Sequence, residues 1–217
     1  MVEALTPLLS PERRAKIDAV LARRLAGLTI VLSNLHDPHN GAAAIRSLEA
    51  LGLAELHVVE TTEPFRFSST VTQGCEKWVS LRRHRAFADG ARVLRDQGFT
   101  LAAAVPGATR TIAELDVSRP TALVFGNEHA GLDAEEQAAC DLTFGIPMPG
   151  MTRSLNLSVS VALAVYDCAQ RRREAVGEGD LPESDRERLR ARFYALSLDD
   201  RGAEPLVERW VRERVSR

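Results

Sequence analysis

The chain has 217 residues, of which 45% are hydrophobic and 27% charged, and its formal net charge is −2 at neutral pH. This length allows one well-packed core with appended helices, and the composition is that of an ordinary globular protein. Residues 1–30 and 171–217 together carry a charge of +3, whereas residues 31–170 carry −5. The overall basic charge that is typical of nucleic-acid-binding domains is therefore absent.

The sequence favours a reducing compartment. No apolar run is as long as a membrane span, and the N-terminus lacks the layout of a secretory signal. Cys75, Cys140 and Cys168 form neither a C-x-x-C pair nor a disulfide framework. His36 and His39 are more typical of a polar turn than of a metal site. We therefore predict a cytoplasmic protein with no membrane partner and no metal.

Short apolar, β-branched runs alternate with helical patterns along most of the chain, which predicts an α/β fold with a parallel sheet. Ser10 and Pro11 are typical of the start of a helix, and Gly27 is typical of its end. Strands are expected at 28–32, 56–59, 100–104, 121–125 and 142–146, with a short strand or turn at 76–81. Helices are expected at 10–27, 42–51, 87–97, 133–140, from 157 onward, at 184–195 and at 205–215, with a helical turn at 112–115.

Three loops that follow predicted strands contain unusual chemistry: residues 40–46, 125–132 and 146–156. Open parallel sheets bind ligands in such loops at the carboxyl ends of their strands. The last loop has Pro147, Pro149 and Gly150 before a helix whose start is rich in Ser, Thr and Asn. The glycine spacing fits neither G-x-G-x-x-G nor a P-loop, which disfavours a Rossmann dinucleotide site or an NTPase.

The three loops resemble the three signature motifs of the SpoU branch of the SPOUT methyltransferases. The matching segments occur in the right order and are NGAAAIR (40–46), LVFGNEHAGL (123–132) and IPMPGMTRSLNLSVS (146–160). A basic N-terminal helix, the segment GCEKWV (74–79) and a charged C-terminal tail are also similar to TrmH-type tRNA (guanosine-2'-O)-methyltransferases.

The resemblance implies a parallel-sheet SPOUT fold with a C-terminal trefoil knot, at residues 28–171. A basic helix (1–27) would precede this domain and a helical extension (172–217) would follow it. The resemblance also implies a homodimer that binds S-adenosyl-L-methionine and methylates a ribose 2'-hydroxyl, with a guanosine of the tRNA D-loop as the target. The implied cofactor-binding residues belong to the second and third motifs: Val124, Phe125, Gly126, Asn127, Gly131, Ile146, Met148, Gly150, Ser154 and Leu155.

Five residues match the catalytic positions of these motifs: Asn40, Arg46, Glu128, Ser154 and Asn156. Arg46 would be the central one, either as a general base or as the group that binds a phosphate and stabilises the 2'-oxyanion. The second role fits its chemistry better, because guanidinium remains protonated in proteins. Asn40 would position a group, Glu128 would hold Arg46 or the ribose, and Ser154 and Asn156 would shape the site. Each residue also has an ordinary explanation as a helix cap, a turn carboxylate or a surface arginine.

RNA contacts are expected from local basic clusters: Arg13, Arg14, Arg23 and Arg24 near the N-terminus, and Lys77, Trp78, Arg82 and Arg83 in the middle. Further basic residues are Lys16, Arg85 and Arg171–Arg173. For each cluster a solvated helix face, and for Trp78 a buried position, is the alternative. Ribosomal RNA is the alternative substrate, although only about 27 residues precede the first strand. A non-catalytic RNA-binding protein with the same fold is less favoured, because all five catalytic residue types are in place.

Overall fold

A computed structural model describes residues 1–62 and 64–199, which form two compact units. The larger unit is Leu25–Glu178, and the smaller one combines Met1–Arg24 with the chain that begins at Gly179. The helix expected at 205–215 lies outside the described residues. The division of the sequence after residues 27 and 171 stays a prediction.

The larger unit is built on a sheet of six parallel strands in the order β3-β2-β1-β5-β4-β6. The strands are β1 Leu28–Ser33, β2 Glu55–Val59, β3 Ser80–His84, β4 Thr100–Ala104, β5 Thr121–Phe125 and β6 Leu142–Phe144. This arrangement confirms the predicted parallel α/β sheet. Strands β2 and β3 extend the sheet on one side of β1, whereas β5, β4 and β6 lie in that order on the other side, so the β1–β5 boundary is a topological switch point.

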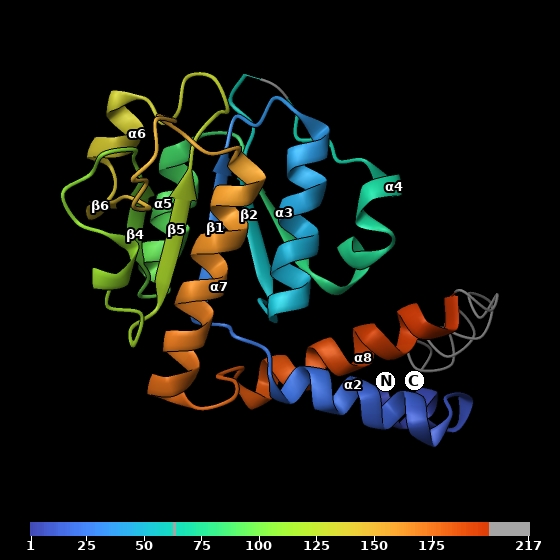
Figure 1. The fold of residues 1–217 in the computed structure, drawn as a ribbon. Coiled ribbons are helices and arrows are strands. Elements are labelled where there is room, and N and C mark those ends of the chain that lie inside the picture. Colours follow the sequence, from blue (N-terminus) through green and yellow to red (C-terminus); the bar gives the residue numbers. More distant parts are fainter. Residues whose placement is uncertain (63, 200–217) are drawn as a thin grey trace. The chain divides into compact units, whose positions relative to one another are not determined.

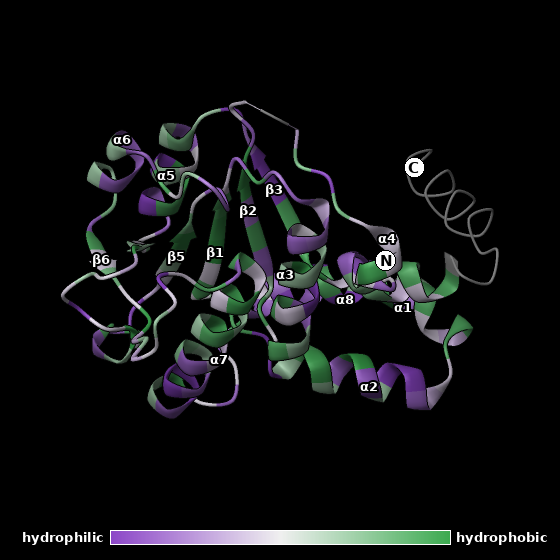
Figure 2. Ribbon diagram, turned by 45° about the horizontal axis from the view of Figure 1, so that its top comes forward, coloured by the Kyte–Doolittle hydropathy of each residue, from purple (hydrophilic) through white to green (hydrophobic). Residues whose placement is uncertain are grey.

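Helices cover both faces of this sheet (Figure 1). Leu123 and Phe125 of β5 pack in the core formed with α3 (Pro38–Leu51) and α7 (Leu157–Val176), whereas Ala122 and Val124 pack in the core formed with α5 (Phe87–Asp96). A strand buried on both faces has no polar side, which explains the apolar run from Ala122 to Phe125 in β5. Figure 2 shows the same burial as mostly hydrophobic colouring of the central strands. The remaining elements are α4 Ser69–Thr72, η2 Cys75–Trp78, η3 Ile112–Glu114 and α6 Ala134–Ala138.

Two element boundaries differ from the sequence prediction in ways that affect the site. Helix α3 begins at Pro38 instead of residue 42, because the Asp37 side chain accepts a hydrogen bond from the His39 amide and Pro38 occupies the first helical position. Asn40 therefore lies in the first turn of a helix and not in a loop. The segment 76–81, expected as a short strand or a turn, divides into the 3₁₀ turn η2, which ends at Trp78, and strand β3, which begins at Ser80.

Arg171, Arg172 and Arg173 hold the second half of α7 to the domain. Their guanidinium groups donate to backbone carbonyls: Arg171 to Leu115 and Ile112 at 2.7 and 2.8 Å, Arg172 to Val117 and Arg119 at 2.8 and 2.9 Å, and Arg173 to Leu51 at 2.9 Å. Arg172 is only 5% exposed. A solvated helix face is the expectation for this cluster, but in the structure its guanidinium groups satisfy backbone carbonyls of the same domain.

The smaller unit is helical, with α1 Val2–Leu5, η1 Thr6–Leu8, α2 Pro11–Ala22 and α8 Glu183–Asp199. The Ser10 hydroxyl caps α2 as predicted, by accepting a hydrogen bond from the Arg13 amide at 3.2 Å. The helix ends at Ala22, five residues before Gly27. An ion pair between Arg190 and Asp18 at 2.8 Å joins α8 to α2. Within the described ranges, no helix combines the length and hydropathy that crossing a membrane requires.

Candidate active site

The three sequence motifs meet at the carboxyl edge of the sheet, near the switch point. The first motif occupies the start of α3, the second follows β5, and the third connects β6 to α7. Because all six strands are parallel, the segments that follow them leave the sheet on the same side. Figure 1 shows these segments gathered above the strands.

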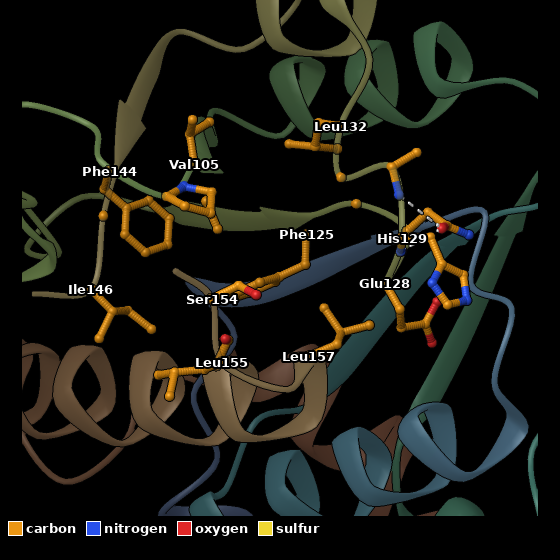
Figure 3. A pocket seen from close by; sticks show the side chains of 18 of the residues that line it. Val105, Phe125, Glu128, His129, Leu132, Phe144, Ile146, Ser154, Leu155 and Leu157 are labelled. Atoms are coloured by element: carbon orange, nitrogen blue, oxygen red, sulfur yellow. Dashed lines mark hydrogen bonds between the residues drawn. The ribbon is translucent and has the colours of Figure 1, made fainter. Parts of the chain in front are cut away.

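A cavity of about 340 Å³ lies between the segments that follow β4, β5 and β6. Figure 3 shows apolar side chains along most of its wall, among them Phe144, Ile146 and Leu155, and the polar side chains of Glu128 and His129 at one end. Of the predicted cofactor-binding residues, these line the cavity: Phe125, Gly126, Asn127, Gly131, Ile146, Met148, Ser154 and Leu155. The structure therefore brings most of that predicted set around one space.

Two predicted cofactor-binding residues lie elsewhere. Val124 is fully buried in the core against α5, and Gly150 is exposed in the loop that precedes α7. The cavity is also lined by residues that the sequence analysis did not select: Ala104, Val105, Pro106, Leu132, Gln137, Phe144, Leu157 and Ser160. Val105 and Pro106 directly follow a predicted strand, so the rule that ligands bind after parallel strands would have identified them.

Gly126 lets two parts of the second motif come into close contact. Asn127 and Gly131 exchange backbone hydrogen bonds of 3.1 and 2.8 Å, which folds residues 127–131 into a tight turn. A β-carbon at residue 126 would lie 2.1 Å from the carbonyl carbon of Gly131. Gly131 itself has a φ of +71°, which favours glycine. The shape of this cavity wall thus depends on two glycines.

A chain of side-chain hydrogen bonds joins all three motifs. The Glu128 carboxylate accepts from Asn40 Nδ2 at 3.0 Å and from the amides of His36 and Asp37 at 3.1 and 3.2 Å. Asn40 Oδ1 in turn accepts from Asn156 Nδ2 at 3.1 Å. We call this the Glu128–Asn40–Asn156 network. Its members come from the second, first and third motifs respectively.

The network keeps Glu128 ionised. Partial burial of its carboxyl favours the neutral form, but the hydrogen bonds from Asn40 and from the backbone amides outweigh burial and lower the pKa of Glu128. Asn40 itself is 8% exposed. The site therefore presents a fixed negative charge whose oxygens already have donors.

Asn156 has a second role as the N-cap of α7. Its Oδ1 atom accepts from the Ser158 amide at 2.9 Å and from the Val159 amide at 3.4 Å. The capping interpretation is thus correct for Asn156, and the same side chain also reaches Asn40 through its Nδ2 atom. Ser154 lies at the cavity wall (Figure 3), two residues before the helix cap.

Arg46 lies on the exposed side of α3, where its Nη1 atom donates to the carbonyl of Val71 at 3.4 Å. Glu128, expected to hold either Arg46 or the ribose, accepts a hydrogen bond from Asn40 in the structure, and its contact with the ribose stays a prediction. The guanidinium of Arg46 is therefore held by one long hydrogen bond and faces solvent, which suits a group that contacts a large anionic substrate.

The predicted RNA-binding residues fall into different environments. Arg24 is 1% exposed and its guanidinium lies 5.8 Å from the centre of the Phe193 ring, so its assignment to RNA is wrong. Arg14 is half-buried, Arg23 is exposed, and Arg13 donates to the Ser197 hydroxyl at 3.0 Å. Lys77 and Trp78 are half-buried in η2.

On the exposed strand β3, Arg82 pairs with Glu55 at 3.1 Å, and Arg83 bonds both Glu60 at 2.5 Å and the Phe65 carbonyl at 3.2 Å. In the described ranges, no three His, Cys, Asp or Glu side chains are grouped as metal ligands.

Solved structures with this fold define the class as RNA-modifying methyltransferases. One, described as an Aquifex aeolicus TrmH/SpoU tRNA modifying enzyme, superimposes with a TM-score of 0.76 at 27% identity, over 86% of this chain and 97% of that one. Another is an AdoMet-bound rRNA methyltransferase from Sinorhizobium meliloti, with a TM-score of 0.62 at 25% identity, over 70% and 60% of the two chains.

The sequence profile of the SpoU rRNA methylase family matches residues 27–166, and the chain belongs to this family. A tRNA (guanosine(18)-2'-O)-methyltransferase from Thermus thermophilus is 40% identical over 176 residues, which are 81% of this chain and 90% of the relative. The protein of the same description from Escherichia coli K12 is 36% identical, over 83% and 81%. A 23S rRNA (guanosine-2'-O-)-methyltransferase RlmB from Vibrio parahaemolyticus is 31% identical, over 72% and 64%. These matches confirm the resemblance drawn from the three motifs.

Proposed function

We propose that this protein is a tRNA methyltransferase that transfers a methyl group from S-adenosylmethionine to the ribose 2'-hydroxyl of guanosine 18 in the D-loop. The observation that carries the proposal is the Glu128–Asn40–Asn156 network, which joins the three methyltransferase motifs beside a ligand-sized cavity. The relatives of 40% and 36% identity are named for this reaction and align over more than four fifths of this chain.

The cavity suits S-adenosylmethionine in size and chemistry. Its walls combine apolar side chains with the exposed backbone of the Gly126–Gly131 turn, and such sites bind ligands with a flat apolar part and a few polar groups. The residues that would hold the cofactor are Phe125 to Asn127, Gly131, Ile146, Met148, Ser154 and Leu155. The cofactor supplies a methyl group on a positively charged sulfur, a donor that requires no metal.

The chain's own residues would orient the acceptor and stabilise charge. Glu128 presents a fixed polar group at the cavity, because the buried Asn40 side chain, itself bonded to Asn156, donates a hydrogen bond to it. Arg46 would bind a phosphate next to the target ribose and stabilise the oxyanion that develops on O2'. Guanidinium is protonated at all physiological pH values, so we do not assign it the role of general base.

The homodimer is part of this proposal, and one face of α7 supports it. Val159, Leu163 and Tyr166 recur at helical spacing and are 45%, 47% and 57% exposed, whereas Val161 and Val165 are buried in the core. Exposed apolar stripes of this kind mark contact surfaces. Light scattering should give twice the mass of 23.8 kDa. The Leu163→Glu variant should shift toward the monomer. A wild-type protein that scatters light as a monomer would contradict the dimer.

The trefoil knot, the cytoplasmic location and the three-part domain division complete the proposal. The knot would involve the chain from β6 through α7, by resemblance to the family. The exposed Arg23 of the helical unit, with Arg13 and Arg14, would bind the tRNA outside the reaction centre. Cytoplasmic action agrees with three cysteines that are free thiols in the structure.

Ribosomal RNA is the second candidate substrate, favoured by the 31% identical RlmB relative. The test uses labelled S-adenosylmethionine with unmodified tRNA and with ribosomal RNA, followed by identification of the methylated nucleoside. Label on 2'-O-methylguanosine in the D-loop supports the proposal, and label in ribosomal RNA alone would replace the substrate. Cofactor binding without transfer to either RNA would point to another RNA substrate, whereas absence of cofactor binding would favour the non-catalytic RNA-binding alternative.

A further inference from the structure

Asn34, which directly follows β1, has an unusual backbone conformation. Its φ is +51°, and of the non-glycine residues that the structure describes only Gln73, also at +51°, shares a positive φ. Side chains clash with the backbone in this left-handed region, although asparagine tolerates it better than most residues do. Such conformations persist where neighbouring contacts hold them, and they are concentrated at functional sites. The contacts of Asn34 therefore indicate what this conformation serves.

Asn34 is fastened to the end of β2. Its side-chain Oδ1 atom accepts hydrogen bonds from the amides of Thr61 and Thr62 at 3.0 and 3.2 Å. Its own amide donates to the carbonyl of Val59, the last residue of β2, at 3.0 Å. Because these three bonds fix both the backbone amide and the side chain, they also fix the direction in which the Asn34 carbonyl points.

The Asn34 carbonyl holds the tight turn of the second motif. It accepts a hydrogen bond of 2.7 Å from Nδ2 of Asn127. Asn127 Oδ1 accepts from the amides of His129 and Ala130 at 2.8 and 3.3 Å. The side-chain amide of Asn127 is thus used within the protein, to close the turn on one side and to attach it to Asn34 on the other. Asn127 lines the cavity, whereas Asn34 does not.

We propose that Asn34 is a positioning residue for the cofactor cavity, which fixes the second-motif turn where S-adenosylmethionine binds. It acts through two hydrogen-bonded links: the segment of Thr61 and Thr62 anchors Asn34, and Asn34 anchors Asn127. Binding sites need their contact residues within about 0.5 Å of the correct geometry, and supporting residues behind them provide that precision. This inference rests on the proposed function, which assigns the cavity to S-adenosylmethionine.

The effect of Asn34 should be confined to the cofactor half of the site. Arg46, the proposed phosphate-binding residue, lies on α3 and donates to the Val71 carbonyl, outside both links. Glu128 has three donors of its own, one from the Asn40 side chain and two from backbone amides. A substitution of Asn34 should therefore weaken the binding of S-adenosylmethionine and leave the affinity for tRNA near the wild-type value.

The experiment measures S-adenosylmethionine affinity by calorimetry, without RNA, in variants of Asn34. Alanine lacks the Oδ1 acceptor and disfavours a positive φ, so Asn34→Ala should lose about 10- to 100-fold in affinity, the range found when residues that support metal ligands are replaced. Glycine accepts a positive φ, so Asn34→Gly should fold as the wild type does but still bind the cofactor more weakly. Aspartate keeps an acceptor for both threonine amides and tolerates this conformation, so Asn34→Asp should retain most of the affinity.

Gln73→Ala is the matched control. Gln73 has the same φ as Asn34 and is exposed, but it does not line the cavity. Both alanine variants should lower the melting temperature, because each places alanine in the left-handed region. Only Asn34→Ala should also weaken S-adenosylmethionine binding. The affinity of Asn34→Ala for unmodified tRNA, measured by filter binding, should stay near the wild-type value.

The alternative outcomes separate the proposal from the proposed function. Wild-type S-adenosylmethionine affinity in either Asn34→Ala or Asn34→Gly would overturn the proposal. So would an equal loss in Gln73→Ala, or a loss of tRNA affinity as large as the loss of cofactor affinity. A wild-type protein with no affinity for S-adenosylmethionine would contradict the proposal and the proposed function together. A wild-type protein that binds S-adenosylmethionine and methylates neither tRNA nor ribosomal RNA would reject only the proposed function.

Discussion

The two ends of the α3–α7 helix pair use polar side chains for opposite purposes. At the start of both helices, Asn40 accepts a hydrogen bond from Asn156 and donates one to Glu128, beside a cavity. At the far end, the arginines of α7 donate to backbone carbonyls, including that of Leu51, the last residue of α3. Both ends contain several polar side chains. Those at the start of the helices lie beside a cavity, whereas the arginines at the far end satisfy backbone carbonyls. The difference lies in whether carbonyls without secondary-structure partners are within reach.

The largest effect on activity is expected at the start of α3. Arg46→Ala should reduce methyl transfer by about 10²- to 10³-fold, because it removes a donor that stabilises charge in the transition state. The melting temperature should change little, since the side chain is exposed and makes one 3.4 Å hydrogen bond. Single-turnover kinetics and calorimetry measure the two quantities. A loss of S-adenosylmethionine affinity as large as the loss of rate would contradict this role.

The next largest effect is expected from adding a methyl group at Gly126, inside the tight turn of the second motif. Gly126→Ala should weaken S-adenosylmethionine binding by at least about 10-fold, a loss of about 1.4 kcal/mol, because the new methyl group has no room against Gly131. Gly150→Ala is the control, since nothing lies within 4 Å of its β-carbon position and Gly150 does not line the cavity. Equal losses of S-adenosylmethionine affinity in the two variants would contradict this expectation. They would mean that the loop around Gly150 also contacts the cofactor.

At the other end of α7, a substitution should reduce stability strongly and activity little, the opposite of the result expected for Arg46→Ala. Arg172→Met leaves the carbonyls of Val117 and Arg119 without this donor and should lower the free energy of unfolding by about 2–4 kcal/mol. Methyl transfer per folded molecule should stay near the wild-type value. Urea unfolding with a parallel activity assay measures both. Arg119→Met is the control, because that side chain is 79% exposed and its ion pair is 3.7 Å long. Similar stability losses in the two variants would contradict the structural role of Arg172.

Local signals in the sequence predicted the sheet and the three loops, but not the hydrogen bonds that join the side chains of these loops. Most of the strands are apolar runs with glycine or proline nearby, a pattern that is visible within a few residues, whereas the edge strand β3 (SLRRH) lacks it. The Glu128–Asn40 and Asn40–Asn156 bonds instead join residues 88 and 116 positions apart. The roles of Asn40 as a link and of Asn156 as both cap and link therefore required the structure.

The basic clusters show the same limit. Arg24 and Arg83 are equivalent on sequence evidence, as basic residues next to another arginine. In the structure Arg24 is buried against Phe193, and Arg83 fixes the chain between Glu60 and Phe65. Charge alone predicts exposure, but whether a carbonyl, a carboxylate or a ring lies within reach depends on tertiary packing.

The smallest expected effect lies away from both helix ends, in strands β2 and β3. His57 Nδ1 and His84 Nε2 are 2.9 Å apart, and His57 Nε2 lies 3.0 Å from Glu55. Burial, and then the neighbouring His57, lower the pKa of His84. The folded state therefore resists protonation of His84, so stability is complete above the unfolded value of about 6.5 and declines as pH decreases toward the folded pKa. The melting temperature should decrease less between pH 7.5 and 5.5 in His84→Gln than in the wild type, and an equal decrease in the two would contradict this.

The most direct test of the account changes one atom of the substrate. Two tRNAs are compared, one with guanosine and one with 2'-deoxyguanosine at position 18, and methyl transfer and binding are measured for both. The account predicts full methylation of the first tRNA, none of the second, and similar affinity for both. Continued methylation of the 2'-deoxy tRNA would show that the acceptor is another position, and it would contradict the assignment of this site to the 2'-hydroxyl of guanosine 18.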